Sequence, residues 1–176
     1  MFTRSSANAF FEGGTENRTG EYAKVADGIF ISSKFAVFDE KFLITNKIKL
    51  IINASNRDYL STGTARSIPT IKVKNIEDID PGLIKFKQFA DILDEKVKSV
   101  NAIMHEYLEK KQNVLVHCEA GVNRSAFIIA KYLLDYRNYE LIDVLDTLEI
   151  ANKEQRNAPV LTNYCFRNIL QGLHLQ

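Results

Sequence analysis

The sequence predicts an α/β fold, with a central, mostly parallel sheet of four to five strands flanked by helices. Short apolar runs typical of strands alternate along the chain with longer segments whose apolar residues recur at helical spacing. The chain has 176 residues, of which 45% are hydrophobic, and this suits one ordinary core and a single domain. We therefore expect strands and helices to alternate around one sheet.

Four apolar runs are expected to form the strands of this sheet. They occupy residues 28–32, 48–53, 68–73 and 114–116. The stretch 56–69 between the second and third runs carries Gly63 together with Ser and Thr residues, which is typical of a loop.

The helices are predicted from apolar spacing and from start signals. Residues 36–44 show helical spacing, and a long helix is expected to open at Asp80-Pro81-Gly82, with Asp80 as N-cap and Pro81 at the first helical position. One amphipathic stripe then runs from Phe86 to Leu108. Further helices are predicted at about 125–134, 141–151 and 162–171.

The first 20 residues differ in composition from the rest. They are rich in Ser, Asn, Thr and Gly, and we interpret them as a flexible N-terminal arm before a globular domain at 21–176. Phe10 and Phe11 stand side by side in this arm. They either pack on the domain that follows or pack on another copy, and the second alternative would make the protein a homodimer.

Charge and cysteine usage narrow the function classes. The net charge of +1, from 23 basic and 22 acidic residues, gives no polybasic surface, so neither nucleic acid nor a membrane is expected as a partner. Residues 1–18 lack the apolar region of a secretory signal, and the longest apolar runs are far too short to span a bilayer. Two widely spaced cysteines make no disulfide framework, which favours a reducing compartment such as the cytoplasm.

One segment carries chemistry: Cys118 is followed after five residues by Arg124, between an apolar strand and an apolar helix. A strand that enters a helix through a tight loop points successive backbone N–H groups into one concavity, which binds phosphate oxygens, and the helix N-terminus adds favourable potential. Gly121 lets the loop turn where a side chain would obstruct it. We call residues 118–124 the phosphate loop; it consists of Cys118, Glu119, Ala120, Gly121, Val122, Asn123 and Arg124.

Each reactive side chain here has a predicted role. The positive field of the loop would stabilise the thiolate of Cys118 and make it a nucleophile, the alternative being an inert buried thiol. The planar fork of Arg124 can grip two phosphate oxygens. Ser125 can donate to the sulfur and help it leave, and His117 is expected to support the loop through ring hydrogen bonds. Cys165 lacks this context and is interpreted as an ordinary packed thiol.

The segment from His117 to Ser125 resembles the signature His-Cys-x-x-Gly-x-x-Arg-Ser/Thr of the dual-specificity protein phosphatases, a branch of the protein tyrosine phosphatase superfamily. Its form His-Cys-x-Ala-Gly-Val-Asn-Arg-Ser is similar to that of the poxviral members and is compatible with an origin in a large DNA virus. The resemblance extends from about residue 26 to residue 170. It implies hydrolysis of phosphotyrosine and phosphoserine or phosphothreonine in proteins through a cysteinyl-phosphate intermediate, in the host cytoplasm if the origin is viral.

No cofactor or metal is expected for such chemistry. The three histidines, His105, His117 and His174, lack the spacing of metal ligands. The general acid is less clear, because the resemblance places Asn75 where an aspartate is expected. Asp78 is then the preferred candidate and Asp80 the alternative, although Asp80 already serves as a helix cap and Asp78 could equally be a solvated surface carboxylate.

Three other functions remain open from the sequence. A phosphatase of RNA 5′ ends would share Gly121, Asn123 and Arg124, but Ser125-Ala126 stands where Thr-Gly would be expected. A phosphoinositide phosphatase would favour Lys in the loop, whereas Glu119 is expected to repel additional phosphates. A module that binds phosphoproteins without turnover is suggested only by Asn75.

Overall fold

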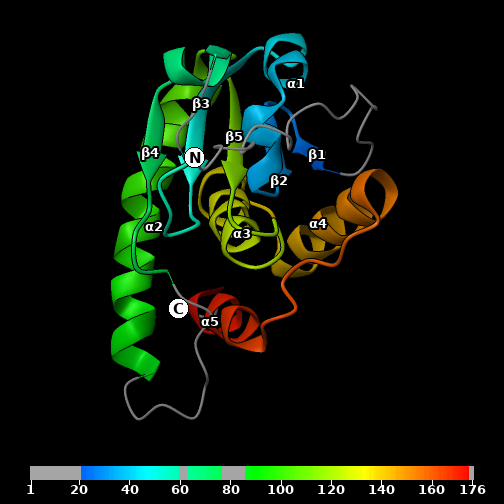
Figure 1. Ribbon diagram of the computed structural model, residues 1–176. Coiled ribbons are helices and arrows are strands. Elements are labelled where there is room, and N and C mark those ends of the chain that lie inside the picture. Colours follow the sequence, from blue (N-terminus) through cyan, green and yellow to red (C-terminus); the bar gives the residue numbers. More distant parts are fainter. Residues whose placement is uncertain (1–20, 60–62, 77–85, 175–176) are drawn as a thin grey trace, which may run out of the picture.

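The computed structural model describes residues 21–59, 63–76 and 86–174. Within these residues one sheet has the strand order β1-β2-β5-β3-β4, in which β1 is antiparallel to β2 and the other neighbours are parallel (Figure 1). The strands are β1 (Tyr22–Ala26), β2 (Ile29–Ser32), β3 (Ile48–Asn53), β4 (Thr70–Lys72) and β5 (Asn113–His117). The predicted α/β class with a mostly parallel sheet is confirmed.

Helices cover both faces of this sheet. One face packs against the long helices α2, α3 and α4, with α5 against α3, and the other packs against η1, α1 and η2. The helices are η1 (Lys34–Phe38), α1 (Glu40–Thr45), η2 (Gly63–Ser67), α2 (Phe86–Glu109), α3 (Arg124–Arg137), α4 (Leu141–Arg156) and α5 (Tyr164–His174).

Side chains of the central strands alternate between two cores. In β5, Val114 and Val116 belong to the larger core beneath α2 and α3, whereas Leu115 belongs to the smaller core beneath η1 and α1. The middle strands β2 and β3 alternate in the same way. This follows from the two-residue period of a strand, which sends successive side chains to opposite faces. The apolar runs appear continuous in the sequence because both faces are buried.

The predicted helix at 36–44 is wrong as a single element, because the chain breaks at Asp39. This residue ends η1 and caps α1, and its Oδ1 accepts a hydrogen bond from the backbone N–H of Phe42 at 2.9 Å. Aspartate suits such a cap because its carboxylate satisfies an N–H that has no partner inside the helix. A capping residue within a segment of helical apolar spacing therefore divides the segment into two helices, although the spacing alone predicts one.

Other boundaries also differ from the prediction. The strand expected at 68–73 is limited to β4, η2 lies within the expected loop 56–69, and β1 was not anticipated. α3 and α4 extend beyond their predicted ends to Asn138 and Asn157, whose left-handed backbones have φ of 54° and 50°. Asparagine tolerates this conformation and so can end a helix as glycine does. The helix start expected at 80–82 lies outside the described residues.

Three parallel strands end at one level, which positions the site. Ser32 at the end of β2 and Asn53 at the end of β3 both pair with His117 at the end of β5. Ligands of open α/β sheets bind at the carboxyl ends of the strands, and the phosphate loop leaves from this edge. Cys118 and Cys165 are both buried and form no disulfide. Among the described helices, none combines the length and apolar character needed to cross a bilayer.

Candidate active site

The phosphate loop joins the end of β5 to the first turn of α3. His117 is the last residue of β5, and α3 begins at Arg124. Gly121, in the middle, has φ of +70°, and a Cβ there would lie 2.5 Å from the backbone carbonyl carbon and oxygen of Ser32. Only glycine fits this close approach of the loop to the end of β2.

The backbone carbonyl groups from His117 to Val122 all have hydrogen-bonding partners outside the concave side of the loop. The partners are the Ala54 N–H for His117 (2.8 Å), His117 Nδ1 for Cys118 (3.3 Å), the Lys34 N–H for Glu119 (3.2 Å), Arg156 Nη2 for Ala120 (2.8 Å), Arg156 Nη1 for Gly121 (2.7 Å) and the Leu161 N–H for Val122 (2.9 Å). Because N–H and C=O point in opposite directions across a trans peptide, the loop N–H groups turn inward. Such an array binds anions.

The sulfur of Cys118 lies inside this array. Its Sγ is 3.2 Å from the backbone nitrogen of Gly121 and 3.3 Å from Oγ of Ser125. Burial alone would raise the pKa of the Cys118 thiol, but hydrogen bonds from the Ser125 hydroxyl and from the N–H groups of Ser125, Val122 and Gly121 together lower it. The thiolate is the reactive form of cysteine, so these contacts favour a nucleophile.

His117 precedes Cys118, and Arg124 is the last residue of the phosphate loop. The imidazole of His117 is buried against the strand ends, and burial lowers its pKa to about 4, so the ring is neutral near neutral pH. Its Nδ1 contacts the Cys118 carbonyl at 3.3 Å, which agrees with loop support. The half-buried guanidinium of Arg124 donates from Nη1 to the Ala54 carbonyl at 3.2 Å.

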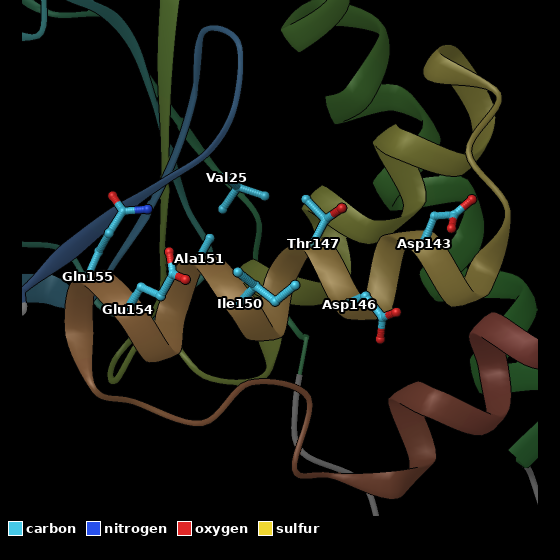
Figure 2. A pocket seen from close by; sticks show the side chains of 8 residues that line it. All are labelled: Val25, Asp143, Asp146, Thr147, Ile150, Ala151, Glu154 and Gln155. Carbon is cyan, nitrogen blue, oxygen red and sulfur yellow. The ribbon is translucent and has the colours of Figure 1, made fainter.

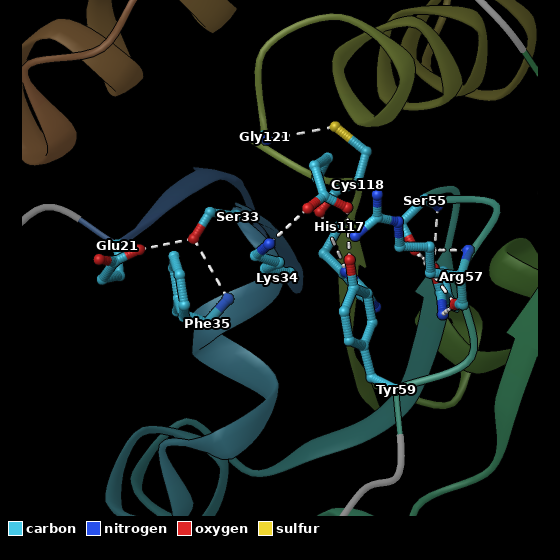
Figure 3. Close-up of polar contacts among 12 residues, drawn as sticks. Glu21, Ser33, Lys34, Phe35, Ser55, Arg57, Tyr59, His117, Cys118 and Gly121 are labelled. Carbon is cyan, nitrogen blue, oxygen red and sulfur yellow. Dashed lines mark hydrogen bonds and ion pairs between the residues drawn. The ribbon is translucent and has the colours of Figure 1, made fainter. Parts of the chain in front are cut away.

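Glu119 is held by two residues far from it in sequence. Its carboxylate pairs with Nζ of Lys34 and accepts a hydrogen bond from the Tyr59 hydroxyl. Figure 3 shows Lys34, the first residue of η1, and Tyr59, from the segment after β3, both approaching the phosphate loop. These two contacts lower the pKa of Glu119. The carboxylate is thus neutralised by Lys34, which weakens the expectation that it repels additional phosphates.

Three supporting residues, Lys34, Tyr59 and Arg156, were missed in the sequence. Arg156 ends α4 and is buried, with Nη1 and Nη2 on the carbonyls of Gly121 and Ala120. Asn123 is fixed in a similar way, since its Oδ1 accepts from the Asn163 N–H at 3.0 Å. A lone polar residue that serves another segment has no period or motif, so no sequence signal could have identified them.

The general acid is not located by the described residues. Asn75, at the position where the family's aspartate is expected, has φ of +59°, and its N–H donates to Oδ1 of Asn56 at 3.0 Å. Asp78 and Asp80 lie outside the described residues. The structure therefore brings together His117, Cys118 and Ser125 without placing an acid beside them.

A hollow lies between β1 and α4 (Figure 2). It is lined by the carboxylates of Asp143, Asp146 and Glu154 and by apolar residues that include Val25 and Ile150. None of its lining residues belongs to the phosphate loop, so it is separate from the thiol chemistry. Over the part of the chain that the structure describes, no three His, Cys, Asp or Glu side chains are grouped to hold a metal ion.

Comparison with known proteins identifies the family. The family model described as "Dual specificity phosphatase, catalytic domain" matches residues 29–171. Dual specificity protein phosphatase 21 of Homo sapiens is 30% identical over 122 residues, which cover 69% of this chain and 58% of that protein. The chain thus spans little more than half the length of this curated relative.

Solved structures share the fold. Human DUSP28 superposes with a TM-score of 0.69 at 21% identity, covering 88% of this chain and 93% of that one. OH1 from the Orf virus, described as a tyrosine phosphatase with triple substrate specificity, has a TM-score of 0.60 at 19% identity, covering 87% and 86%. With the family match across most of the chain, the protein belongs to the dual-specificity phosphatase catalytic-domain family of the protein tyrosine phosphatase superfamily.

Proposed function

We propose that this protein is a cysteine-dependent phosphatase that hydrolyses phosphotyrosine and phosphoserine or phosphothreonine in proteins. The observation that carries the proposal is the thiol of Cys118, held by N–H groups and the Ser125 hydroxyl at the centre of a loop whose carbonyls face away. An array that favours a thiolate also favours the oxygens of a phosphate. Family membership agrees with this chemistry.

The reaction proceeds in two displacements. The Cys118 thiolate attacks phosphorus, a P–S bond forms, and the ester P–O bond breaks while the leaving oxygen takes a proton from a general acid. Water then attacks phosphorus, the P–S bond breaks, and inorganic phosphate leaves. The Ser125 hydroxyl, 3.3 Å from the sulfur, donates to the departing thiolate.

The remaining site residues bind and orient the phosphate. Arg124 turns its fork toward two equatorial oxygens, the backbone N–H groups from Glu119 to Arg124 hold the others, and His117 supports the loop as a neutral ring. Asp78 remains the candidate for the acid. No step requires a cofactor or metal.

A polyphosphorylated substrate is the second candidate, because the carboxylate of Glu119 is paired with Lys34 and does not stand as an isolated negative charge. RNA 5′ ends and phosphoinositides therefore belong in the same assay. OH1, which shares the fold, is itself described as having triple substrate specificity.

The test measures turnover of four substrates side by side: a phosphotyrosine peptide, a phosphothreonine peptide, a 5′-triphosphorylated RNA and a phosphoinositide. We expect kcat/KM to be highest for the peptides. Higher values for the RNA or the lipid would redirect the proposal to that substrate. Phosphopeptide binding without turnover of any substrate would favour the non-catalytic binding module suggested by Asn75.

Cys118→Ser supplies the mechanistic control. Serine does not ionise near neutral pH, so the variant should lose turnover while the intact N–H array still binds a phosphopeptide in a fluorescence anisotropy titration. Turnover within tenfold of the parent would contradict a cysteinyl-phosphate route.

The proposed cellular compartment follows from the chemistry of the cysteine nucleophile. A low-pKa thiolate survives best in a reducing compartment, so we assign the protein to the cytoplasm, and to the host cytoplasm if it is viral. Its partner is a phosphorylated protein, without a role for nucleic acid or membrane, and a homodimer formed through the arm at 1–20 is part of the same proposal.

A further inference from the structure

Arg156 is a buried cation whose hydrogen bonds to the described residues go to neutral oxygens. The residue is 8% exposed at the end of α4. Nη1 donates to the Gly121 carbonyl at 2.7 Å and to Oδ1 of Asn152 at 2.6 Å, and Nη2 donates to the Ala120 carbonyl at 2.8 Å. Burying a guanidinium costs free energy unless an anion pairs with it. A buried guanidinium that donates to two loop carbonyls therefore requires an explanation.

The two carbonyls held by Arg156 determine where two N–H groups point. A trans peptide is planar, so fixing the Ala120 carbonyl also fixes the N–H of Gly121, which lies 3.2 Å from Sγ of Cys118. Fixing the Gly121 carbonyl likewise fixes the N–H of Val122, which contributes to the lowered pKa of the Cys118 thiol. Donation from a cation polarises each peptide and strengthens the hydrogen bond at its other end.

The packing leaves the loop little freedom to turn these peptides otherwise. A Cβ at Gly121 would lie 2.7 Å from Nη2 of Arg156 and 2.5 Å from the carbonyl oxygen of Ser32. The loop backbone is therefore enclosed between the guanidinium and the end of β2. Arg124 acts from another direction, with its Nη1 on the carbonyl of Ala54.

We propose that Arg156 is a positioning residue of the phosphate loop, which sets the peptide planes 120–121 and 121–122 so that their N–H groups stabilise the Cys118 thiolate and then the phosphate. It acts through the backbone and does not touch the substrate. The proposal deepens the phosphatase function and rests on it for its kinetic consequence. Its effect on the thiol is independent of turnover.

The test compares Arg156→Met with Arg137→Met in the full chain. Arg137 is exposed at the opposite end of the 14-residue helix α3, about 20 Å from the loop at 1.5 Å per residue, so this control removes the same charge without touching the loop. The first readout is the pH dependence of alkylation by iodoacetamide, with Cys118→Ser measuring the background from Cys165. The second is kcat/KM for a phosphopeptide.

For Arg156→Met we expect the alkylation midpoint to rise by about one pH unit or more, because two N–H contacts to the thiolate lose their orientation. We expect kcat/KM to fall about 100-fold, mainly in kcat, as when a preorganised donor is removed. Arg137→Met should match the parent in both. An unchanged midpoint in a variant that unfolds at the parent's Tm would overturn the proposal.

Arg156→Lys decides the question if the methionine variant does not fold. Lysine keeps the charge but lacks the fork that reaches both carbonyls. The alkylation midpoint and kcat/KM should therefore lie between the values of the parent and those expected for Arg156→Met, with about a tenfold loss in kcat/KM. Values equal to the parent would show that charge and bulk suffice and would overturn the positioning role. If the parent itself shows no turnover, the phosphatase proposal fails, whereas the alkylation midpoints still test Arg156.

Discussion

At the residue scale, two arginines belong to or contact the phosphate loop, Arg124 and Arg156, and they differ in burial and in hydrogen-bonding partners. Arg124 is half-buried at the first position of α3, and among the described residues its guanidinium donates through Nη1 to the Ala54 carbonyl. Arg156 is buried and its terminal nitrogens are engaged by the loop and by Asn152. The two arginines therefore differ in burial and in hydrogen-bonding partners, which agrees with a supporting role for Arg156 and leaves ligand binding by Arg124 as a prediction.

The first prediction at this scale concerns Arg124. Arg124→Lys should be nearly as damaging as Arg124→Ala, with a loss in kcat/KM on the order of 100-fold or more for each, because lysine keeps the charge but not the fork that matches two equatorial oxygens. Steady-state kinetics on one phosphopeptide measures this. Recovery of most activity by lysine would make Arg124 a point charge.

The second prediction identifies the general acid. Expulsion of an alkoxide needs a proton, and a positioned acid contributes about 10²- to 10⁴-fold, whereas a nitrophenolate leaves without help. Asp78→Asn should therefore slow phosphoserine and phosphotyrosine peptides strongly, leave a nitrophenyl phosphate nearly unaffected, and remove the alkaline limb of the pH–rate profile.

Asp80→Asn is the matched control, since asparagine still caps a helix and should produce neither effect. A selective loss in Asp80→Asn would reassign the acid to that residue. If neither variant shows the selective loss, Asn75 marks an enzyme without a side-chain acid, suited to good leaving groups.

At the scale of elements, α2 and α3 are joined by a buried charge cluster. Lys131 of α3 is 4% exposed and lies 3.1 Å from Asp94 of α2 and 3.2 Å from Asp135, while Lys98 lies 2.6 Å from Asp94. Burial alone would raise the pKa of Asp94, but Lys98 and Lys131 outweigh it and lower the pKa. The ionised form of Asp94 is thus favoured in the folded protein.

The third prediction follows from the sign of this shift. A carboxyl whose pKa is lower in the folded state than in the unfolded state contributes stability that is present above the unfolded value, near 4, and is lost as pH falls through the folded value. Asp94→Asn should reduce the free energy of unfolding at pH 7 by on the order of 3 kcal/mol, because Lys131 loses a buried partner, and by less at pH 3.

Urea unfolding at the two pH values measures this effect. Asp91→Asn, an exposed carboxylate on the same helix, is the control and should change stability by less than about 0.5 kcal/mol at either pH. An equal loss at pH 7 and pH 3 for Asp94→Asn would mean that side-chain packing, and not charge, holds α2 on α3 at this point.

Element types were predicted well where periodicity extended over many residues. β3 and α2 agree closely with the runs at 48–53 and from Phe86 to Leu108, because burial on two faces or on one stripe leaves a repeated pattern. Short elements depend on single residues instead. Asp39 divides η1 from α1, and Asn138 and Asn157 extend and end helices in ways that spacing does not report.

At the scale of the whole molecule, the fourth prediction concerns assembly. Phe10 and Phe11 lie in the arm at 1–20, outside the described residues, and an apolar pair next to polar sequence often marks an interface. We expect the full chain to sediment as a homodimer and the protein lacking residues 1–20 to shift toward the monomer.

Phe10→Ser with Phe11→Ser provides the finer comparison, because the arm keeps its length and loses only its apolar pair. The double variant should also shift toward the monomer in sedimentation velocity. The same monomer mass for all three proteins would reject the dimer.

The sequence by itself determined the prediction of a phosphate-binding loop, because the residues of that loop are consecutive. Seven consecutive residues between a strand and a helix supply the backbone N–H groups, Cys118 and Arg124, so their order was enough to predict a phosphate-binding loop. The α/β class was likewise predicted from the sequence, from the alternation of short apolar runs with segments whose apolar residues recur at helical spacing. Neither of these two predictions required the tertiary structure.

Only the tertiary structure decided what holds the loop and tunes its charge. Arg156 is 36 residues from Ala120, Tyr59 is 60 residues from Glu119 and Lys34 is 85 residues from it, and each is a single polar side chain without a pattern around it. The pairing of β2, β5 and β3 brings two of them to one edge, and the packing of α4 brings the third. A contact between distant segments depends on the register and packing of whole elements, and the residues that make it carry no local trace of their partner.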